Sequence, residues 1–259
     1  MDAANSLAEM VRRHDPDRFF CALFAPAAAR DALFTLYAYN HELARAREVA
    51  SDPTLALIRL QWWREVIEGA PRRHEVATPL AALIAGGLEG APLLAMIETR
   101  EAQVEGPPDT LDAFMAQMRA GPGALAAASG AVLGADAAAR ARLVDLGAAY
   151  GIAGTLRSVG ALAAQDRCLL PLDVLAAAGL SPEAAIASPD AALAAVGPGL
   201  TRAARDLLAA PQWLHRAVRA AALPAVLAQR DLARAPLATP RGLGDRLSVL
   251  RAALLQPRY

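Results

Sequence analysis

The sequence predicts an all-α protein. Apolar residues recur every three to four positions, the period of an amphipathic helix, and no stretch shows the two-residue alternation of a half-buried strand. Alanine, the strongest helix former, supplies much of the 55% hydrophobic fraction. Glycine and proline divide the 259 residues into segments of about 10 to 25 residues, without a linker between them. We therefore expect one helical domain over residues 1–259.

The first long helix is predicted to follow Pro26, because proline is favoured in the first turn of a helix, and to extend over residues 27–50. The next helix is predicted over residues 53–69, which begin with proline and end with glycine. Ser51 or Asp52 is its expected N-cap, because either side chain can accept a hydrogen bond from an N–H group of the first turn.

Clusters of glycine and proline mark the expected breaks farther along the chain. Residues 106–123 and 231–244 are the best loop candidates. The Gly-Pro-Gly sequence at 121–123 is predicted to be a turn, and the one at 197–199 to break a helix, because proline removes a helical hydrogen bond.

The sequence shows no sign of membrane insertion or export. No uninterrupted apolar run reaches the roughly 18 residues of a spanning helix. The N-terminus lacks the basic and apolar regions of a secretion signal. Two cysteines, Cys21 and Cys168, make no disulfide framework, and reducing conditions are the simpler interpretation. We therefore expect a cytoplasmic location.

Charge is balanced overall but unevenly distributed. All 26 basic residues are arginine, and residues 200–259 hold ten of them with three aspartates, a net charge of +7. Such a segment either binds an anionic membrane surface or an acidic partner, or forms an ordinary solvated face. We expect no nucleic-acid partner, because no nucleic-acid-binding motif is present. Three arginine pairs have helical spacing and are each expected on one basic face: Arg202/Arg205, Arg216/Arg219 and Arg230/Arg234.

One predicted helical stripe carries polar side chains. Tyr37, His41, Ala44 and Glu48 recur at i, i+4, i+7 and i+11, so they share a face. On this face His41 is either a general base or a hydrogen-bonded core histidine. Glu48 is either a metal ligand or the partner of a neighbouring arginine on the helix surface.

A second stripe is made of very small side chains, at Gly147, Gly151, Gly154 and Ser158. Glycine inside a helix costs about 0.5 to 1 kcal/mol relative to alanine, so three of them require a structural reason. The stripe either lets another helix approach closely or opens an apolar groove.

Both stripes lie in segments that resemble the two signature regions of the squalene/phytoene synthase family. These segments are LFTLYAYNHELARARE (33–48) and LGAAYGIAGTLRSVGALAAQDRCLLP (146–171), and the marker Leu-x-Trp-Trp-Arg lies at 60–64. The resemblance extends from about Asp17 to about Pro182. It implies an isoprenoid-synthase-type helical bundle around a central apolar cavity. Members of this family join two prenyl diphosphates head to head, with magnesium held by aspartate-rich motifs.

The resemblance also shows which motif positions have changed. The first aspartate pair falls on Ala44 and Glu48, with Arg45 where a further aspartate often follows. Four polar positions of the second motif fall on Gly151, Gly154, Ser158 and Leu162, its tyrosine on Leu169, and the early diphosphate-binding serine on Arg18. Magnesium requires oxygen ligands, normally including one or two carboxylates. The changes therefore predict no metal site and no cofactor, with magnesium implied only if the chain is an active enzyme.

The resemblance implies two sets of site residues in place of a confident catalytic group. The expected cavity-lining residues are Tyr37, Asn40, His41, Glu48, Gly151, Gly154, Arg157 and Ser158. The candidates for binding diphosphate or another anion are Arg45, Arg64 and Arg157.

More closely, the chain resembles a degenerate branch of the family, which includes a mitochondrial complex I assembly factor and its alphaproteobacterial relatives. The shared features are Asn40-x-Glu42-Leu43-Ala44 in place of the aspartate-rich motif, and Gly151-Ile152 with Leu156-Arg157. This resemblance implies a non-catalytic protein that assembles respiratory complex I at the inner membrane. It also implies partners among complex subunits or assembly proteins, a peripheral contact with the membrane, and a prenyl or other lipid ligand. The alternative is an active head-to-head prenyltransferase with altered metal and diphosphate ligands.

Overall fold

The computed structural model describes residues 3–48, 52–210, 214–234 and 239–255; within them, the side chains of residues 3–5 and of Glu48 lie outside the description. Every regular element in these ranges is helical and none is a strand, which confirms the all-α prediction. The helices are α1 Ala3–His14, α2 Pro16–Ala22, η1 Ala27–Ala29, α3 Arg30–Glu48, α4 Pro53–Ile67, α5 Ala77–Ala85, α6 Ala91–Glu105, α7 Leu111–Met118, η2 Arg119–Gly123, α8 Ala124–Val132, α9 Ala137–Ala163, α10 Leu172–Ala177, α11 Pro182–Ala187, α12 Pro189–Ala209, α13 Arg219–Ala222, α14 Pro224–Asp231 and α15 Leu243–Leu254.

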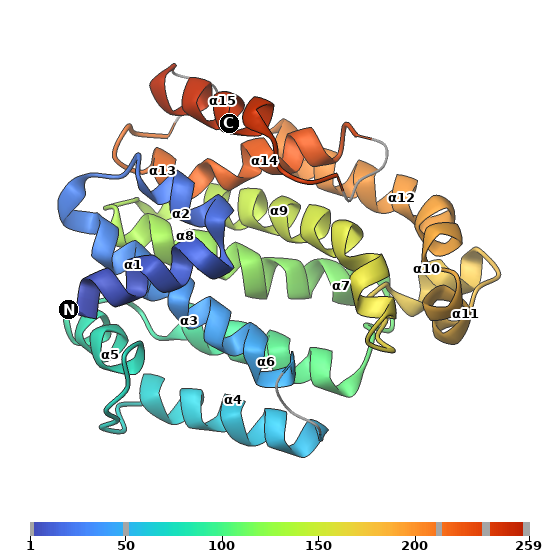
Figure 1. Ribbon diagram of the computed structural model, residues 1–259, viewed down its shortest axis with the longest axis horizontal. Coiled ribbons are helices and arrows are strands. Elements are labelled where there is room, and N and C mark those ends of the chain that lie inside the picture. Colours follow the sequence, from blue (N-terminus) through green and yellow to red (C-terminus); the bar gives the residue numbers. More distant parts are fainter. Residues whose placement is uncertain (1–2, 49–51, 211–213, 235–238, 256–259) are drawn as a thin grey trace.

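The longest helix, α9, runs through the middle of the bundle (Figure 1). It packs against α8 and η2 on one side and against α12 and α14 on the other. Helices α3, α6 and α4 form the opposite part of the molecule. A buried contact joins two of them, because the Tyr39 hydroxyl of α3 donates to the Leu93 carbonyl of α6 at 2.9 Å. Trp63 of α4 packs edge-on against the Tyr39 ring.

The helix signals read from the sequence are largely met at α4. Asp52 is the N-cap and accepts from the Thr54 N–H at 2.6 Å, while Pro53 is the first helical residue. The chain leaves the helix at Gly69, whose φ of +101° is readily adopted only by glycine. The helix predicted to follow Pro26 directly begins slightly later. Pro26 precedes the short 3₁₀ turn η1, and α3 begins at Arg30.

Two predicted breaks are wrong. Residues 106–123 are not a loop, because they contain α7 and the π-helical segment η2. The Gly-Pro-Gly sequence at 197–199 lies inside α12. In both places packing against α9 stabilises helical backbone that local propensity disfavours. Of the loop predicted over 231–244, residues 235–238 lie outside the described residues, and α15 already begins at Leu243.

The small-residue stripe of α9 serves both of the purposes left open by the sequence. A methyl group at Gly151 would lie 2.3 Å from Cγ of Pro122, and one at Gly147 would lie 2.5 Å from the Pro122 carbonyl oxygen. These glycines therefore allow η2 to pack directly on α9. At Gly154 a methyl group would meet nothing within 4 Å. This part of the stripe lines a cavity.

Several arginines near the C-terminus form ion pairs with buried aspartates. Asp231 of α14 and Asp245 of α15 are buried, with 1% and 2% of their side chains exposed. Asp245 accepts from Arg230 at 2.7 Å and also pairs with Arg234. The Arg230/Arg234 pair therefore does not form the exposed basic face predicted from its spacing, because two buried carboxylates draw these side chains inward.

The second buried carboxylate joins the C-terminal part to the central helix. Asp231 accepts from Arg157 of α9 at 3.1 Å and from Arg241 at 2.8 Å. Arg241 also donates to Asp17 of α2 at 2.9 Å. Arg219 is buried as well and donates to a backbone carbonyl of residue 255, so the Arg216/Arg219 prediction is also wrong.

None of the described helices is long and apolar enough to cross a membrane.

Candidate functional site

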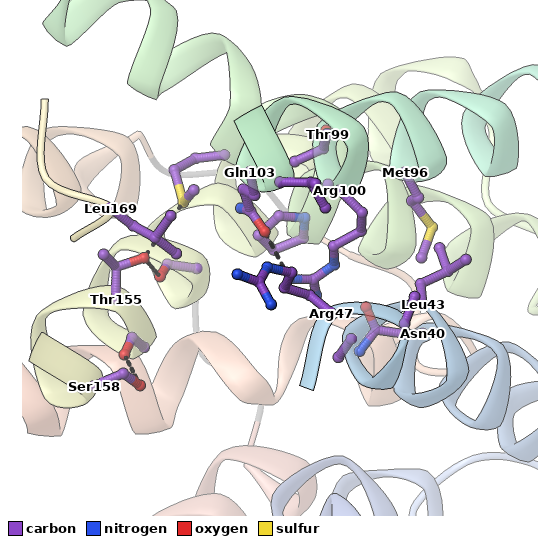
Figure 2. A pocket seen from close by; sticks show the side chains of 18 of the residues that line it. Asn40, Leu43, Arg47, Met96, Thr99, Arg100, Gln103, Thr155, Ser158 and Leu169 are labelled. Atoms are coloured by element: carbon purple, nitrogen blue, oxygen red, sulfur yellow. Dashed lines mark hydrogen bonds between the residues drawn. The ribbon is translucent and has the colours of Figure 1, made fainter. Parts of the chain in front are cut away.

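A cavity of about 290 Å³ lies between α3, α6, η2 and α9 (Figure 2). It therefore lies between the two helices that carry the altered motifs. Its apolar walls are formed by leucine and methionine side chains, namely Leu43, Leu60, Met96, Met118, Leu162 and Leu169. The small residues Ala44, Gly151 and Gly154 leave space between these walls.

Four arginines line the same cavity: Arg18, Arg47, Arg100 and Arg167. Arg47 comes from the last turn of α3 and Arg100 from the middle of α6, and Figure 2 shows both side chains extending into the cavity. Arg100 donates to the Gln103 amide oxygen at 2.9 Å, which orients its guanidinium group. The cavity expected to be apolar is thus strongly basic over part of its wall.

Arg18 is largely enclosed, with 13% of its side chain exposed. Burial by itself lowers the pKa of its guanidinium, but the neighbouring Asp15 carboxylate, 2.7 Å away, and the rings of Tyr150 and Tyr37 outweigh it and raise the pKa. The guanidinium carbon lies 4.7 Å from the centre of the Tyr150 ring, within the range of a cation–π contact. Arg18 therefore remains charged at any physiological pH.

No carboxylate is among the described residues that line the cavity. The described part of the chain also contains no group of three or more His, Cys, Asp or Glu side chains that could hold a metal ion. The hydroxyl groups of Thr155 and Ser158 donate to helix carbonyls, at 3.1 and 2.8 Å. Magnesium prefers near-octahedral oxygen ligands that include carboxylates, whereas guanidinium groups attract the same phosphate oxygens and repel the metal. The described residues of this cavity therefore do not fit a magnesium site.

Several residues predicted to be in the cavity lie along it. Asn40, Gly151, Gly154 and Ser158 line the wall. The altered motif positions Ala44 and Leu162 do so as well. Tyr37 lies beside a small neighbouring void that it shares with Arg18.

Other predicted residues do not line this cavity. His41 stacks on the His14 ring of α1, with centroids 4.2 Å apart. Arg45 is exposed on the outer side of α3 and pairs with Glu42 at 3.2 Å. Arg64 pairs with Glu101 at 2.8 Å between α4 and α6. Arg157 is bound to Asp231, as described above, and the Glu48 side chain lies outside the described residues.

The physical reason for these corrections on α3 is a rotation of the predicted stripe. The cavity face runs through Asn40, Ala44 and Arg47, at i, i+4 and i+7, whereas the predicted stripe began at Tyr37 and included His41. The sequence interpretation therefore missed Arg47 as a cavity residue. It also missed Arg100 and Arg167, because no periodicity within one helix places them opposite α3.

Comparisons with known proteins agree with this architecture. The squalene/phytoene synthase family profile matches residues 11–257. The crystal structure of a dehydrosqualene synthase in complex with ligand superposes with a TM-score of 0.74 at 12% identity, covering 97% of this chain and 95% of that one. The squalene synthase HpnC from Alicyclobacillus acidocaldarius superposes with a TM-score of 0.69 at 19% identity, covering 89% and 92%. These structures show that the fold is of the isoprenoid synthase type.

The curated proteins that are similar in sequence are described as assembly factors and not as synthases. The mouse protein described as NADH dehydrogenase (ubiquinone) complex I, assembly factor 6 is 28% identical over 185 residues, which are 68% of this chain and 55% of that protein. The human protein of the same description is 37% identical over 60 residues, 23% of this chain and 18% of that protein. The matched segments thus span from 18% to 55% of these relatives' own lengths. The chain, matched over nearly its whole length by the family profile, belongs to the squalene/phytoene synthase family.

Proposed function

We propose that this protein is a non-catalytic member of the family that acts in the assembly of respiratory complex I, peripherally at the inner membrane. The names of its sequence relatives support the assembly role. The observation that carries the non-catalytic part is that the described cavity wall contains no carboxylate, and that Ala44, Ser158 and Leu162 stand there at positions of the aspartate-rich motifs. Ionisation of a prenyl diphosphate requires strong stabilisation of the leaving group, which metal ions supply through carboxylate-bound sites.

The last helix supports the membrane part of this proposal. Four leucines of α15 lie at i, i+4, i+7 and i+11 and are exposed: Leu243 by 78%, Leu247 by 62%, Leu250 by 37% and Leu254 by 68%. Arg246 and Arg251 are exposed on the same helix. A helix with an apolar stripe and flanking arginines matches an anionic bilayer surface, because leucines enter the interface while arginines contact lipid phosphates. This surface replaces the Arg216/Arg219 and Arg230/Arg234 pairs as the basis of the membrane proposal.

The alternative, an active head-to-head prenyltransferase, uses arginines of the cavity to stabilise the leaving diphosphate. It would require the chain to supply this stabilisation without the carboxylates of the family. The transferase would make an isoprenoid product, whereas an assembly protein would change the amount of assembled complex I.

Deletion of the gene in its source organism separates them. Native gel electrophoresis with an in-gel NADH dehydrogenase stain would report assembled complex I, and lipid extraction would report squalene-type products. We expect assembled complex I to fall and the isoprenoid profile to remain unchanged, with recovery on re-expression of the wild-type chain. Normal complex I with loss of an isoprenoid product would contradict the proposal and favour the transferase.

A further inference from the structure

We propose that two copies of this chain form an antiparallel dimer through α12, in which Asp190 of each copy pairs with Arg205 of the other. The surface that makes the contact is a groove along α12, separate from the cavity between α3 and α9. The dimer goes beyond the assembly function proposed above and does not depend on it.

The groove has a volume of about 610 Å³ and lies between α12 and the residues Leu232 and Arg234, which follow α14. Helix α12 is 21 residues long, packs against α9 and lies at the edge of the bundle (Figure 1). Six of its residues line the groove as one row at helical spacing: Asp190, Ala194, Gly197, Pro198, Thr201 and Arg205. A row of this kind can serve as the contact face for a second helix that lies along the first.

The two ends of the row carry opposite charges. Asp190 is exposed in the first turn of α12, whereas Arg205 is exposed about 20 Å farther along the helix axis. Arg205 donates one N–H to the Leu232 carbonyl at 2.5 Å, and this neutral acceptor leaves its positive charge in place. Arg202, one turn earlier, is also exposed and lines the groove. The carboxylate and the guanidinium groups are therefore too far apart to meet within one copy.

A two-fold axis brings these opposite ends together. Asp190 and Arg205 lie equally far from the midpoint of the row, which falls between Gly197 and Pro198. When a second α12 lies antiparallel across that midpoint, Asp190 of each copy faces Arg205 of the other, and two ion pairs form. The antiparallel arrangement also places opposite ends of the two helix dipoles side by side. Such an interface is self-complementary and closes after two copies.

The centre of the row allows the two helices to approach closely. Ala194 and Thr201 are also equally far from the midpoint, so they face each other across the axis on either side of Gly197 and Pro198. With residues of this size the helix axes can come within about 8 Å of each other. Pro198 has no N–H to donate to the Ala194 carbonyl, and in the dimer the Thr201 hydroxyl of the second copy can donate to it.

Sedimentation velocity of the full-length chain over a range of concentrations tests the proposal. We expect a dimer that dissociates on dilution, because a contact about 20 Å long belongs among the smaller protein interfaces. Asp190→Arg and Arg205→Asp should each weaken dimerisation by about tenfold or more, since each variant places like charges face to face at both ends of the interface.

A matched control separates the groove from the rest of the helix. Asp206→Arg makes the same change of charge as Asp190→Arg on an exposed residue of α12 that does not line the groove, so it should leave dimerisation unchanged. Circular dichroism melting of each variant shows that it is folded. Asp190→Arg keeps the test independent of the hydrogen bond that Arg205 makes to the Leu232 carbonyl.

An equimolar mixture of Asp190→Arg and Arg205→Asp gives the sharpest result. In the mixed dimer every introduced residue faces the opposite charge, so both ion pairs are restored, and we expect an affinity within about threefold of the wild type. The proposal would be overturned by a mixture that stays monomeric, or by a control variant that loses dimerisation as Asp190→Arg does. A wild-type chain that stays monomeric at the highest concentration would also overturn it and would assign the groove to a different partner.

Discussion

Gly151 and Pro122 decide how closely the π-helical segment η2 approaches α9. A larger side chain at Gly151 meets Pro122 Cγ at 2.3 Å, so Gly151→Leu should destabilise the fold by about 1 to 3 kcal/mol through overpacking. Gly160→Leu is the matched control on the same helix, since a methyl group there meets nothing within 4 Å. Urea unfolding of both variants is the measurement. An unchanged midpoint for Gly151→Leu would show that this packing is absent.

Asp245 makes stability depend on acid pH. Burial by itself raises the pKa of this carboxyl, but hydrogen bonds from Arg230, the Gly242 N–H and Arg234 outweigh it and lower the pKa well below the ordinary value of 3.8. The resulting stabilisation is complete above that ordinary value and is lost as the pH falls through the lower, folded-state pKa.

The variant Asp245→Asn should therefore lower the free energy of unfolding by about 1 to 3 kcal/mol at neutral pH. The difference between wild type and variant should shrink in acid, because Asp245 of the unfolded wild-type chain takes up a proton below its ordinary pKa and this stabilises the unfolded state. Urea titrations at about pH 7 and about pH 3 measure this difference. A difference that is equal at both pH values would contradict the assigned charge pairing.

Helix α15 is the element expected to meet the membrane. Replacing Leu247 and Leu254 with glutamine should reduce flotation with anionic liposomes several-fold, because each exposed leucine contributes up to about 1.5 to 3 kcal/mol when fully buried in an apolar environment. Ile58→Gln is the control, since Ile58 is 59% exposed on α4, at the opposite end of the molecule (Figure 1).

Salt and lipid charge test the same element in a second way. Flotation should weaken in high salt and with neutral vesicles, because the contribution of Arg246 and Arg251 is electrostatic. Equal losses for the α15 and Ile58 variants, or binding that ignores salt and lipid charge, would show that α15 is not the membrane contact.

At the scale of elements, the sequence predicted helices where their end signals are local, but not where they depend on packing. The residues 53–69 gave a correct helix, because capping and glycine signals are local. The helical state of residues 111–123 and 197–199 could not be predicted, because it depends on packing against α9. The direction of Arg230 could not be predicted either, since its buried partner Asp245 lies fifteen residues away on another helix.

At the scale of the molecule, the resemblance predicted the fold class and the two helices that flank the cavity. It did not predict which arginines would meet there. Arg47 and Arg45 are two positions apart and so extend from nearly opposite sides of the helix, and the orientation of α3 about its axis decides which of them faces inward. Arg100 and Arg167 enter the cavity only through the tertiary arrangement of α6 and the segment after α9.

The central proposal is that the cavity does not hold magnesium as the aspartate-rich motifs of the family do. Calorimetric titration of magnesium into the protein, with a farnesyl diphosphate analogue present, tests it most directly. We predict only weak, non-saturating heats, because the described wall contains four guanidinium groups and no carboxylate. A saturable magnesium signal in the low micromolar range, abolished by Glu48→Ala, would contradict the account.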